Sequence, residues 1–221
     1  DDPWPGVPFY ASVELNPANP FWNDFAIVNA YVTRAQSFLQ AGRPDEDVLL
    51  YYNIHDRWVR RGDGRMPHFG HGRDPVGTSA APAAAALHAA GYGFDYVSDR
   101  LLEGVTFRNA GLQSAQAHYA AIVVPETMLM PEPSLAKLVQ LAEDGATIVV
   151  LKQLPHDAPG LYASLQDEST NVDAGRTPTS PLAPLLAKIQ AHASVADGFT
   201  TAPVGRGKFL IGNVPVTLLA H

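Results

Sequence analysis

The sequence predicts an α/β fold in which a mostly parallel sheet is covered by helices on both faces. From Asp47 onward, short apolar runs alternate with helical patterns in the order strand, helix, strand, turn, strand, helix, strand. This order is typical of parallel sheets. The runs are continuously apolar, as expected for strands buried on both faces. A short strand at 7–13 and a long helix at 20–41 are predicted to precede this alternation.

The long helix has sequence signals at both ends. Asn19 can cap its start and Pro20 suits its first position. Apolar residues then recur at three- and four-residue spacing, which defines one apolar face. Gly42 fits a left-handed C-terminal cap, and Pro44 prevents the helix from continuing. The prolines ahead of the 7–13 run confine that strand to a beginning or to an edge.

Four buried strands and three further helices are predicted in the rest of the chain. The strands are expected at 47–52, 94–99, 119–126 and 146–152. Helices are expected at 80–90, 131–143 and 181–193, with a short helical turn at 99–104. The segment 199–220 reads as a strand, a glycine-containing turn and a strand. It is either an antiparallel edge of the sheet or the start of a further domain.

Composition excludes several classes of function. The 221 residues carry a net charge of −7 and no basic run, so nucleic acid is not expected as a partner. The absence of cysteine excludes disulfides, iron–sulfur clusters and a cysteine nucleophile. No apolar run approaches the roughly 20 residues that span a bilayer, so a membrane is not an expected partner. The first ten residues, DDPWPGVPFY, lack the pattern of a signal peptide.

The long loop between 53 and 78 contains two possible binding motifs. Its stretch GDGRMPHFGHG neither follows a strand directly nor opens a helix, so it is not a nucleotide-binding loop. His68 and His71 lie close to Asp63 and Asp74, an arrangement that could bind a metal. Zinc sites use three or four fixed ligands, so surface histidines are the simpler interpretation, and no metal site is predicted.

The stretch YYNIHDRW, residues 51–58, is the best candidate for ligand contact. It ends the first buried strand, where open α/β sheets place ligands. Asn53, His55 and Asp56 supply polar groups, and Trp58 supplies a flat apolar face. The alternative is an ordinary hydrogen-bonded turn between a strand and a loop.

Sugar chemistry has weaker candidates elsewhere. Glycoside hydrolysis needs two carboxylates that flank the bond, and no sequence context singles out any of Glu14, Glu126 and Asp157. No Gly-x-Ser-x-Gly elbow for a serine nucleophile occurs. Aromatic residues near the start could form a sugar-stacking surface, with packing as the alternative. The candidates for sugar contact there are Trp4, Tyr10 and Trp22, next to Phe9 and Phe21.

Four stretches carry a family resemblance. They are WPGVPFYASVELNPANPFWNDFAIVNAYVTRAQSFLQAGRPDEDVLLYYNIHDRW, LHAAGYGFDYVSDRLLEG, YAAIVVPETMLMPEPSLAKLVQLAEDGATIVVLKQLP and DAPGL. Together they span roughly residues 3 to 165, and they resemble the α-L-rhamnosidases of glycoside hydrolase family 106 and their large bacterial relatives. The resemblance implies a (β/α)8 catalytic barrel followed by a class I glutamine amidotransferase-like domain of flavodoxin-like architecture.

The resemblance also implies a division of this chain. Residues 1–45 would hold the last barrel strand and helix, residues 46–195 the amidotransferase-like domain, and residues 196–221 a β-rich tail or the start of a further domain. The family's catalytic carboxylates lie on earlier barrel strands, which this chain does not contain, so no catalytic residue is assigned. An amidotransferase nucleophile would be a cysteine after ATIVVLK, where this chain has Lys152-Gln153-Leu154. Glutaminase chemistry is therefore not expected.

The expected function is to form part of a glycoside hydrolase acting on rhamnose-containing or related plant or bacterial glycans, mainly as its non-catalytic α/β domain. The alternative is a stand-alone, non-catalytic carbohydrate-binding module. The expected partners are carbohydrate and the remaining polypeptide, and the expected location is secreted or periplasmic. No cofactor is expected. Relatives in the family can bind calcium, but no site for it is identifiable in this sequence.

Overall fold

The computed structural model describes residues 16–17, 19–59, 78–115, 117–160 and 180–220. The chain divides into two compact units, with one boundary between Arg43 and Pro44. The strand expected at 7–13 lies outside the described residues. Each unit is considered by itself, because their relative placement is not determined.

The N-terminal unit contains one long helix. A 3-10 turn, η1 (Trp22–Asp24), leads into α1 (Phe25–Ala41). Asn19 Oδ1 accepts a hydrogen bond from the Phe21 amide at 2.9 Å, but the expected start with Pro20 as the first helical residue is wrong, because helical geometry begins at Trp22. The expected left-handed cap at Gly42 is wrong, because its φ and ψ are −90° and −175°. The chain becomes extended at Gly42, where the helix ends. This agrees with Pro44, because a proline disfavours helical geometry at the residue before it.

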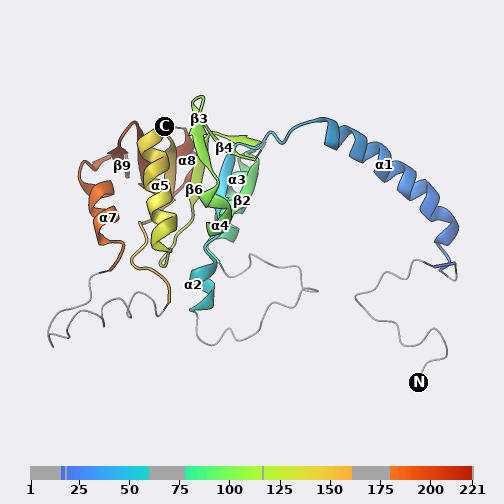
Figure 1. The fold of residues 1–221 in the computed structure, drawn as a ribbon, viewed down its shortest axis with the longest axis horizontal. Helices are drawn as coiled ribbons and strands as arrows, with labels where there is room; N and C mark the ends of the chain where they lie inside the picture. Colours follow the sequence, from blue (N-terminus) through green and yellow to red (C-terminus); the bar gives the residue numbers. More distant parts are fainter. Residues whose placement is uncertain (1–15, 18, 60–77, 116, 161–179, 221) are drawn as a thin grey trace, which may run out of the picture. The chain divides into compact units, whose positions relative to one another are not determined.

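The second unit is built on a seven-stranded sheet in the order β2-β1-β6-β7-β10-β9-β8 (Figure 1). Its parallel strands are β1 (Val48–Tyr51), β2 (Phe94–Val97), β6 (Ala121–Val124), β7 (Thr147–Leu151) and β10 (Gly207–Gly212). Two antiparallel strands extend the sheet beyond β10, namely β9 (Phe199–Val204) and β8 (Ser194–Ala196). The predicted mostly parallel α/β fold is confirmed.

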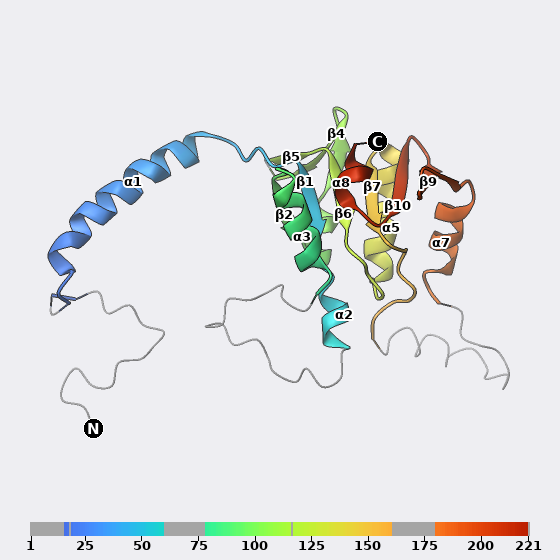
Figure 2. The same cartoon turned by 180° about the vertical axis from the view of Figure 1, so that it is seen from behind.

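Helices cover both faces of the sheet. One face carries α4 (Asp99–Glu103), α5 (Glu132–Asp144) and α7 (Ala183–Gln190) (Figure 1). The other carries α3 (Ala80–Ala89) and α8 (Pro215–Leu219) (Figure 2). Alternate residues of each central strand enter the two cores, as Leu49 and Val48 of β1 do. This two-sided burial explains why the central strands are continuously apolar.

The sequence did not predict a second, three-stranded antiparallel sheet. It consists of β3 (Thr106–Arg108), β4 (Gly111–Ser114) and β5 (Ala117–Tyr119). The β3–β4 turn places Asn109 and Ala110 at φ values of 53° and 61°. Two successive left-handed residues form the tight hairpin turn that matches strand twist, but alanine is not a residue that announces such a turn. The run expected as one strand at 119–126 is therefore split between two sheets.

The C-terminal segment belongs to the main sheet. β10 pairs with β7 in parallel and with β9 in antiparallel register. Of the two interpretations of 199–220, the structure shows an extension of the same sheet, followed by α8 rather than by a loop. A second short helix, α2 (Ile54–Trp58), occupies the start of what the sequence suggested was a long irregular loop. No helix in the described ranges is both long and apolar enough to cross a bilayer.

Tyr119 links the small sheet to β2 and leads to a prediction about alkaline stability. Its hydroxyl donates to Asp95 Oδ2 at 2.7 Å. Burial, then the hydrogen bond to Asp95 and its charge, raise the pKa of Tyr119 to about 12. An unfolded tyrosine ionises near pH 10. The stability that neutral Tyr119 contributes is therefore complete below about pH 10 and lost as the pH rises from about 10 to 12.

Chemical unfolding of the wild type and Tyr119→Phe at several alkaline pH values tests this. The stability difference between the two proteins should shrink between about pH 10 and 12, while the difference in phenolate absorbance between wild type and variant shows Tyr119 ionising near pH 12. Parallel loss of stability in both proteins would contradict the assignment.

Candidate functional site

The site occupies the carboxyl ends of the parallel strands. From β1 the chain crosses to β2 on one side, and it later returns to β6 on the other side of β1. The strand order therefore reverses between the carboxyl ends of β1 and β6. We call this point the crevice, because open α/β sheets bind ligands at such a point. Asn53 follows β1 here and Glu126 follows β6.

Asn53 joins the two sides of this crevice. It is 1% exposed, and its Nδ2 lies 3.1 Å from the Glu126 carbonyl oxygen and 2.9 Å from Ser79 Oγ. Ser79 Oγ also donates to the same carbonyl, at 2.5 Å. The Oδ1 of Asn53 is buried without a hydrogen-bond partner among the described residues. The acceptors around Nδ2 fix the orientation of the Asn53 amide. Asn53 therefore connects the end of β1 to the end of β6.

Asp56 holds the loop that follows β6. It is buried, and its two oxygens accept the amides of Met128 and Leu129 at 2.9 and 2.7 Å. Asn53 Nδ2 adds a third hydrogen bond at 3.0 Å. A carboxylate that accepts several N–H groups is stabilised without a counter-cation. The acidic residue of the predicted ligand stretch therefore already binds the backbone of the loop after β6.

Asp99 forms a second network next to this loop. Its Oδ1 accepts the hydroxyls of Tyr51 at 2.6 Å and Ser134 at 2.5 Å, and its Oδ2 lies 3.0 Å from His55 Nε2. Burial, followed by the hydrogen bond to Asp99, raises the pKa of Tyr51. Because a carboxylate can only accept, Nε2 of His55 is the donor in this contact.

Trp58 gives this region an exposed aromatic surface. Its side chain is 71% exposed, and its ring meets the His55 ring edge-on, with centroids 5.3 Å apart. Trp58 is the most exposed member of the predicted stretch, the His55 side chain is 18% exposed, and Asn53 and Asp56 are buried. Of the three aromatic candidates near the start, Trp22 is half-exposed and packs edge-on against Phe25. Trp4 and Tyr10 lie outside the described residues.

The turn after β7 carries a strained lysine. Lys152 has a φ of 65°, a conformation that costs a non-glycine residue energy and is concentrated at functional turns. Its Nζ pairs with Glu126 Oε2 at 2.5 Å across the ends of β7 and β6. This is the turn in which the family resemblance would require a cysteine for glutaminase chemistry, and both partners of the ion pair are partly exposed.

The remaining acidic and histidine candidates do not gather into a site. Asp157 Oδ1 accepts the Ser180 hydroxyl and the Ala158 amide, both at 2.8 Å. Within the described ranges, no group of three histidine or acidic side chains could hold a metal ion. The loop and N-terminal candidates lie outside the described residues, namely Glu14, Asp63, His68, His71 and Asp74.

Sequence reasoning placed Asn53, His55, Asp56 and Trp58 at the correct edge of the sheet but did not find their partners. Asp99 and Ser134 are 35 residues apart and meet only because α4 and α5 pack side by side. The sequence feature that could have identified Asp99 as a site residue is its position shortly after the carboxyl end of β2. Ser79 lies at the N-cap position of α3, and sequence reasoning did not consider it.

Comparison with known proteins gives a fold likeness to glycoside hydrolases. No protein-family model matches the chain, and no curated protein does either. A rhamnosidase from Novosphingobium sp. PP1Y matches with a TM-score of 0.56 and 18% identity, over 93% of this chain and 16% of that protein. A catalytic mutant of Gan42B, a GH42 β-galactosidase from G. stearothermophilus, matches with a TM-score of 0.47, 14% identity and coverage of 90% and 31%. The exo-β-1,4-mannosidase Op5Man5 from Opitutaceae bacterium strain TAV5 matches with a TM-score of 0.41, 16% identity and coverage of 87% and 36%.

These matches concern part of each larger protein. This chain spans about a sixth of the length of the rhamnosidase and about a third of the galactosidase. At these identities the likeness establishes the fold, and the rhamnosidase alone exceeds a TM-score of 0.5 among the three proteins compared above.

Proposed function

We propose that this chain is the α/β part of a glycoside hydrolase of the α-L-rhamnosidase type, acting on rhamnose-containing or related glycans. The observation that carries the proposal is the fold likeness that extends over 93% of this chain but over 16% of a rhamnosidase. On this proposal residues 1–45 end the catalytic barrel, residues 46–195 hold most of the amidotransferase-like domain, and residues 196–221 complete its sheet with β9 and β10. The remaining polypeptide and carbohydrate are its partners, and its location is secreted or periplasmic.

The arrangement of carboxylates supports a non-catalytic role for this part. A glycosidase needs two carboxylates that face the bond to be cleaved. At the carboxyl edge, both oxygens of Asp56 and of Asp99 already accept protein hydrogen bonds. Glu126 pairs with Lys152, and Asp157 holds Ser180. Among the described residues of this edge, these acidic groups maintain the loops.

The reading frame upstream of the codon for Asp1 tests the proposal. Sequencing the coding DNA is expected to show a continuous frame that encodes alternating strands and helices of a (β/α)8 barrel. A start codon or a signal peptide immediately before Asp1 would contradict the proposed division of the chain.

A second function, binding of carbohydrate by the α/β unit itself, is favoured by one observation. Trp58 is 71% exposed and is braced by His55, which Asp99 holds in place. An indole face next to a hydrogen-bond acceptor is suited to the apolar face and hydroxyls of a sugar ring. The second ring nitrogen of His55, Nδ1, would then bond one hydroxyl.

Calorimetric titration with rhamnose-containing oligosaccharides measures this second function. Trp58→Ala is expected to weaken binding by about tenfold or more, because exposed tryptophans that contact a ligand carry a large share of the binding energy. Tyr31→Ala is the matched control, since Tyr31 is also an exposed aromatic residue but belongs to the other unit and is not a candidate for sugar contact. Absence of heat at millimolar ligand, or equal loss in both variants, would rule out a Trp58 site.

A further inference from the structure

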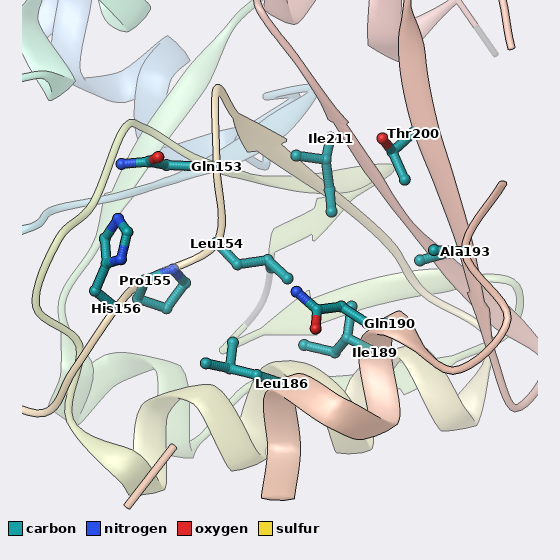
Figure 3. A pocket seen from close by; sticks show the side chains of 11 residues that line it. Gln153, Leu154, Pro155, His156, Leu186, Ile189, Gln190, Ala193, Thr200 and Ile211 are labelled. Atoms are coloured by element: carbon teal, nitrogen blue, oxygen red, sulfur yellow. The ribbon is translucent and has the colours of Figure 1, made fainter. Parts of the chain in front are cut away.

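A cavity of about 400 Å³ lies between α7, the sheet and the turn after β7 (Figure 3). Small-ligand sites span about 300–1,000 Å³, so the space suffices for a single sugar ring. Its floor and walls include Leu154 from the turn, Leu186 and Ile189 from α7, and Ile211 from β10. The cavity is separate from the crevice between β1 and β6, because none of the crevice residues lines it.

The wall formed by the turn is preformed. The left-handed backbone of Lys152 turns the chain sharply at the end of β7. The amides of His156 and Asp157 then both donate to the Met128 carbonyl, at 2.9 and 3.3 Å, and the Met130 amide donates to the Asp157 carbonyl at 3.0 Å. These bonds fix the turn to the loop after β6, so a ligand in the cavity would not have to order this wall.

The polar lining determines the chemical class of ligand. Gln190, Thr200 and His156 supply an amide, a hydroxyl and an imidazole, and none of the described residues that line the cavity is a lysine, arginine, aspartate or glutamate. Figure 3 shows Gln190 turned toward Leu154, so that a hydrogen-bonding group stands next to the apolar wall. A charged ligand would lose hydration without a counter-charge here. The lining therefore suits a neutral molecule with one apolar edge and several hydroxyls.

We propose that this cavity binds a neutral 6-deoxyhexose, such as L-rhamnose, at a non-catalytic subsite. The C6 methyl group lies against Leu186 and Ile211, and ring hydroxyls bond to Gln190 and Thr200. The choice of rhamnose rests on the proposed function, whereas the requirement for a deoxygenated edge rests on the lining alone. Binding of a free monosaccharide here is on the order of millimolar, as expected for a few hydrogen bonds and one apolar contact.

Titration of the nitrogen-15-labelled full chain with two matched sugars tests the proposal. L-rhamnose and L-mannose differ only by a hydroxyl at C6. L-rhamnose is expected to shift the side-chain amide signals of Gln153 and Gln190 saturably. L-mannose should bind about tenfold more weakly, because its extra hydroxyl enters an apolar wall.

Variants locate the binding. Leu186→Trp fills the cavity and should abolish the saturable shifts, while Gln190→Leu should weaken binding by about fivefold through loss of one hydrogen bond. Gln140→Leu, an exposed glutamine on the neighbouring helix α5, is the matched control and should change nothing. Thermal melts confirm that each variant is folded.

Three results would overturn the subsite. They are no saturable shift at tens of millimolar L-rhamnose, equal affinity for L-mannose, or shifts that persist in Leu186→Trp. Each leaves the proposed function standing, because that depends on the upstream reading frame and on hydrolysis rather than on this cavity. If L-rhamnose binds as expected but the upstream frame encodes no barrel, the subsite holds and the proposed function fails.

Discussion

Replacing Asp56 by alanine is expected to lower the free energy of unfolding by about 3–5 kcal/mol. The substitution leaves the Met128 and Leu129 amides and the Asn53 side chain without their acceptor. The hydrogen bond from Asn53 is buried and those from the two amides are part-buried, so water replaces the lost bonds only in part. Because Asp56 joins the segment after β1 to the segment after β6, both sides of the crevice should loosen together.

Urea unfolding of the purified chain measures this effect, with Asp45→Ala as the control. Asp45 is exposed and lies just before β1, so its removal should change stability by less than about 0.5 kcal/mol. Asp56→Asn should fall between the two, since an amide keeps one acceptor oxygen. If Asp56→Ala is as stable as Asp45→Ala, the carboxylate is not the structural centre of the crevice.

Gly207→Ala is expected to cost about 3 kcal/mol, because extra volume is forced against fixed backbone. A Cβ on Gly207 would contact the Ala146 carbonyl oxygen and would lie 2.6 Å from that of Ala142. The Lys208 amide bonds to that same Ala146 carbonyl at 3.2 Å. The beginning of β10 is thus pinned beside the end of α5, and neither segment can move without breaking the β7–β10 pairing.

Gly104→Ala is the matched control for this substitution. Gly104 ends α4 with a φ of −81°, and its added Cβ would meet nothing closer than 3.6 Å. Its replacement should alter stability by less than about 1 kcal/mol. Thermal melts of both variants decide the point, and equal melting temperatures would show that the strand start at Gly207 has room to adjust.

The sequence predicted the layers of this fold because strands that are buried on both faces are continuously apolar. Each of β1, β6 and β7 is a run of apolar residues that alternate between the two cores. The small antiparallel sheet left no comparable trace. Its strands are three or four residues long, and its tight turn uses Ala110 in a left-handed conformation, which no local propensity predicts.

The sequence predicted which residues of the candidate site follow β1. It did not predict which residues from other strands contact them. The position of Asn53 and His55 follows from the end of β1, but their roles depend on partners from other strands. Asp99 comes from the end of β2, and the carbonyl of Glu126 from the end of β6. A single sequence does not give the strand order, and the strand order decides which carboxylates already accept protein hydrogen bonds.

Hydrolysis of an aryl α-L-rhamnoside by the purified chain tests the central claim most directly. The assay compares the wild type with Glu126→Gln and Asp157→Asn, the two described carboxylates that could have been catalytic acids. If the carboxylates of this chain maintain loops and the catalytic pair lies elsewhere, all three proteins release aryl alcohol at the rate of the buffer blank. Turnover by the wild type that either single substitution abolishes would contradict the account.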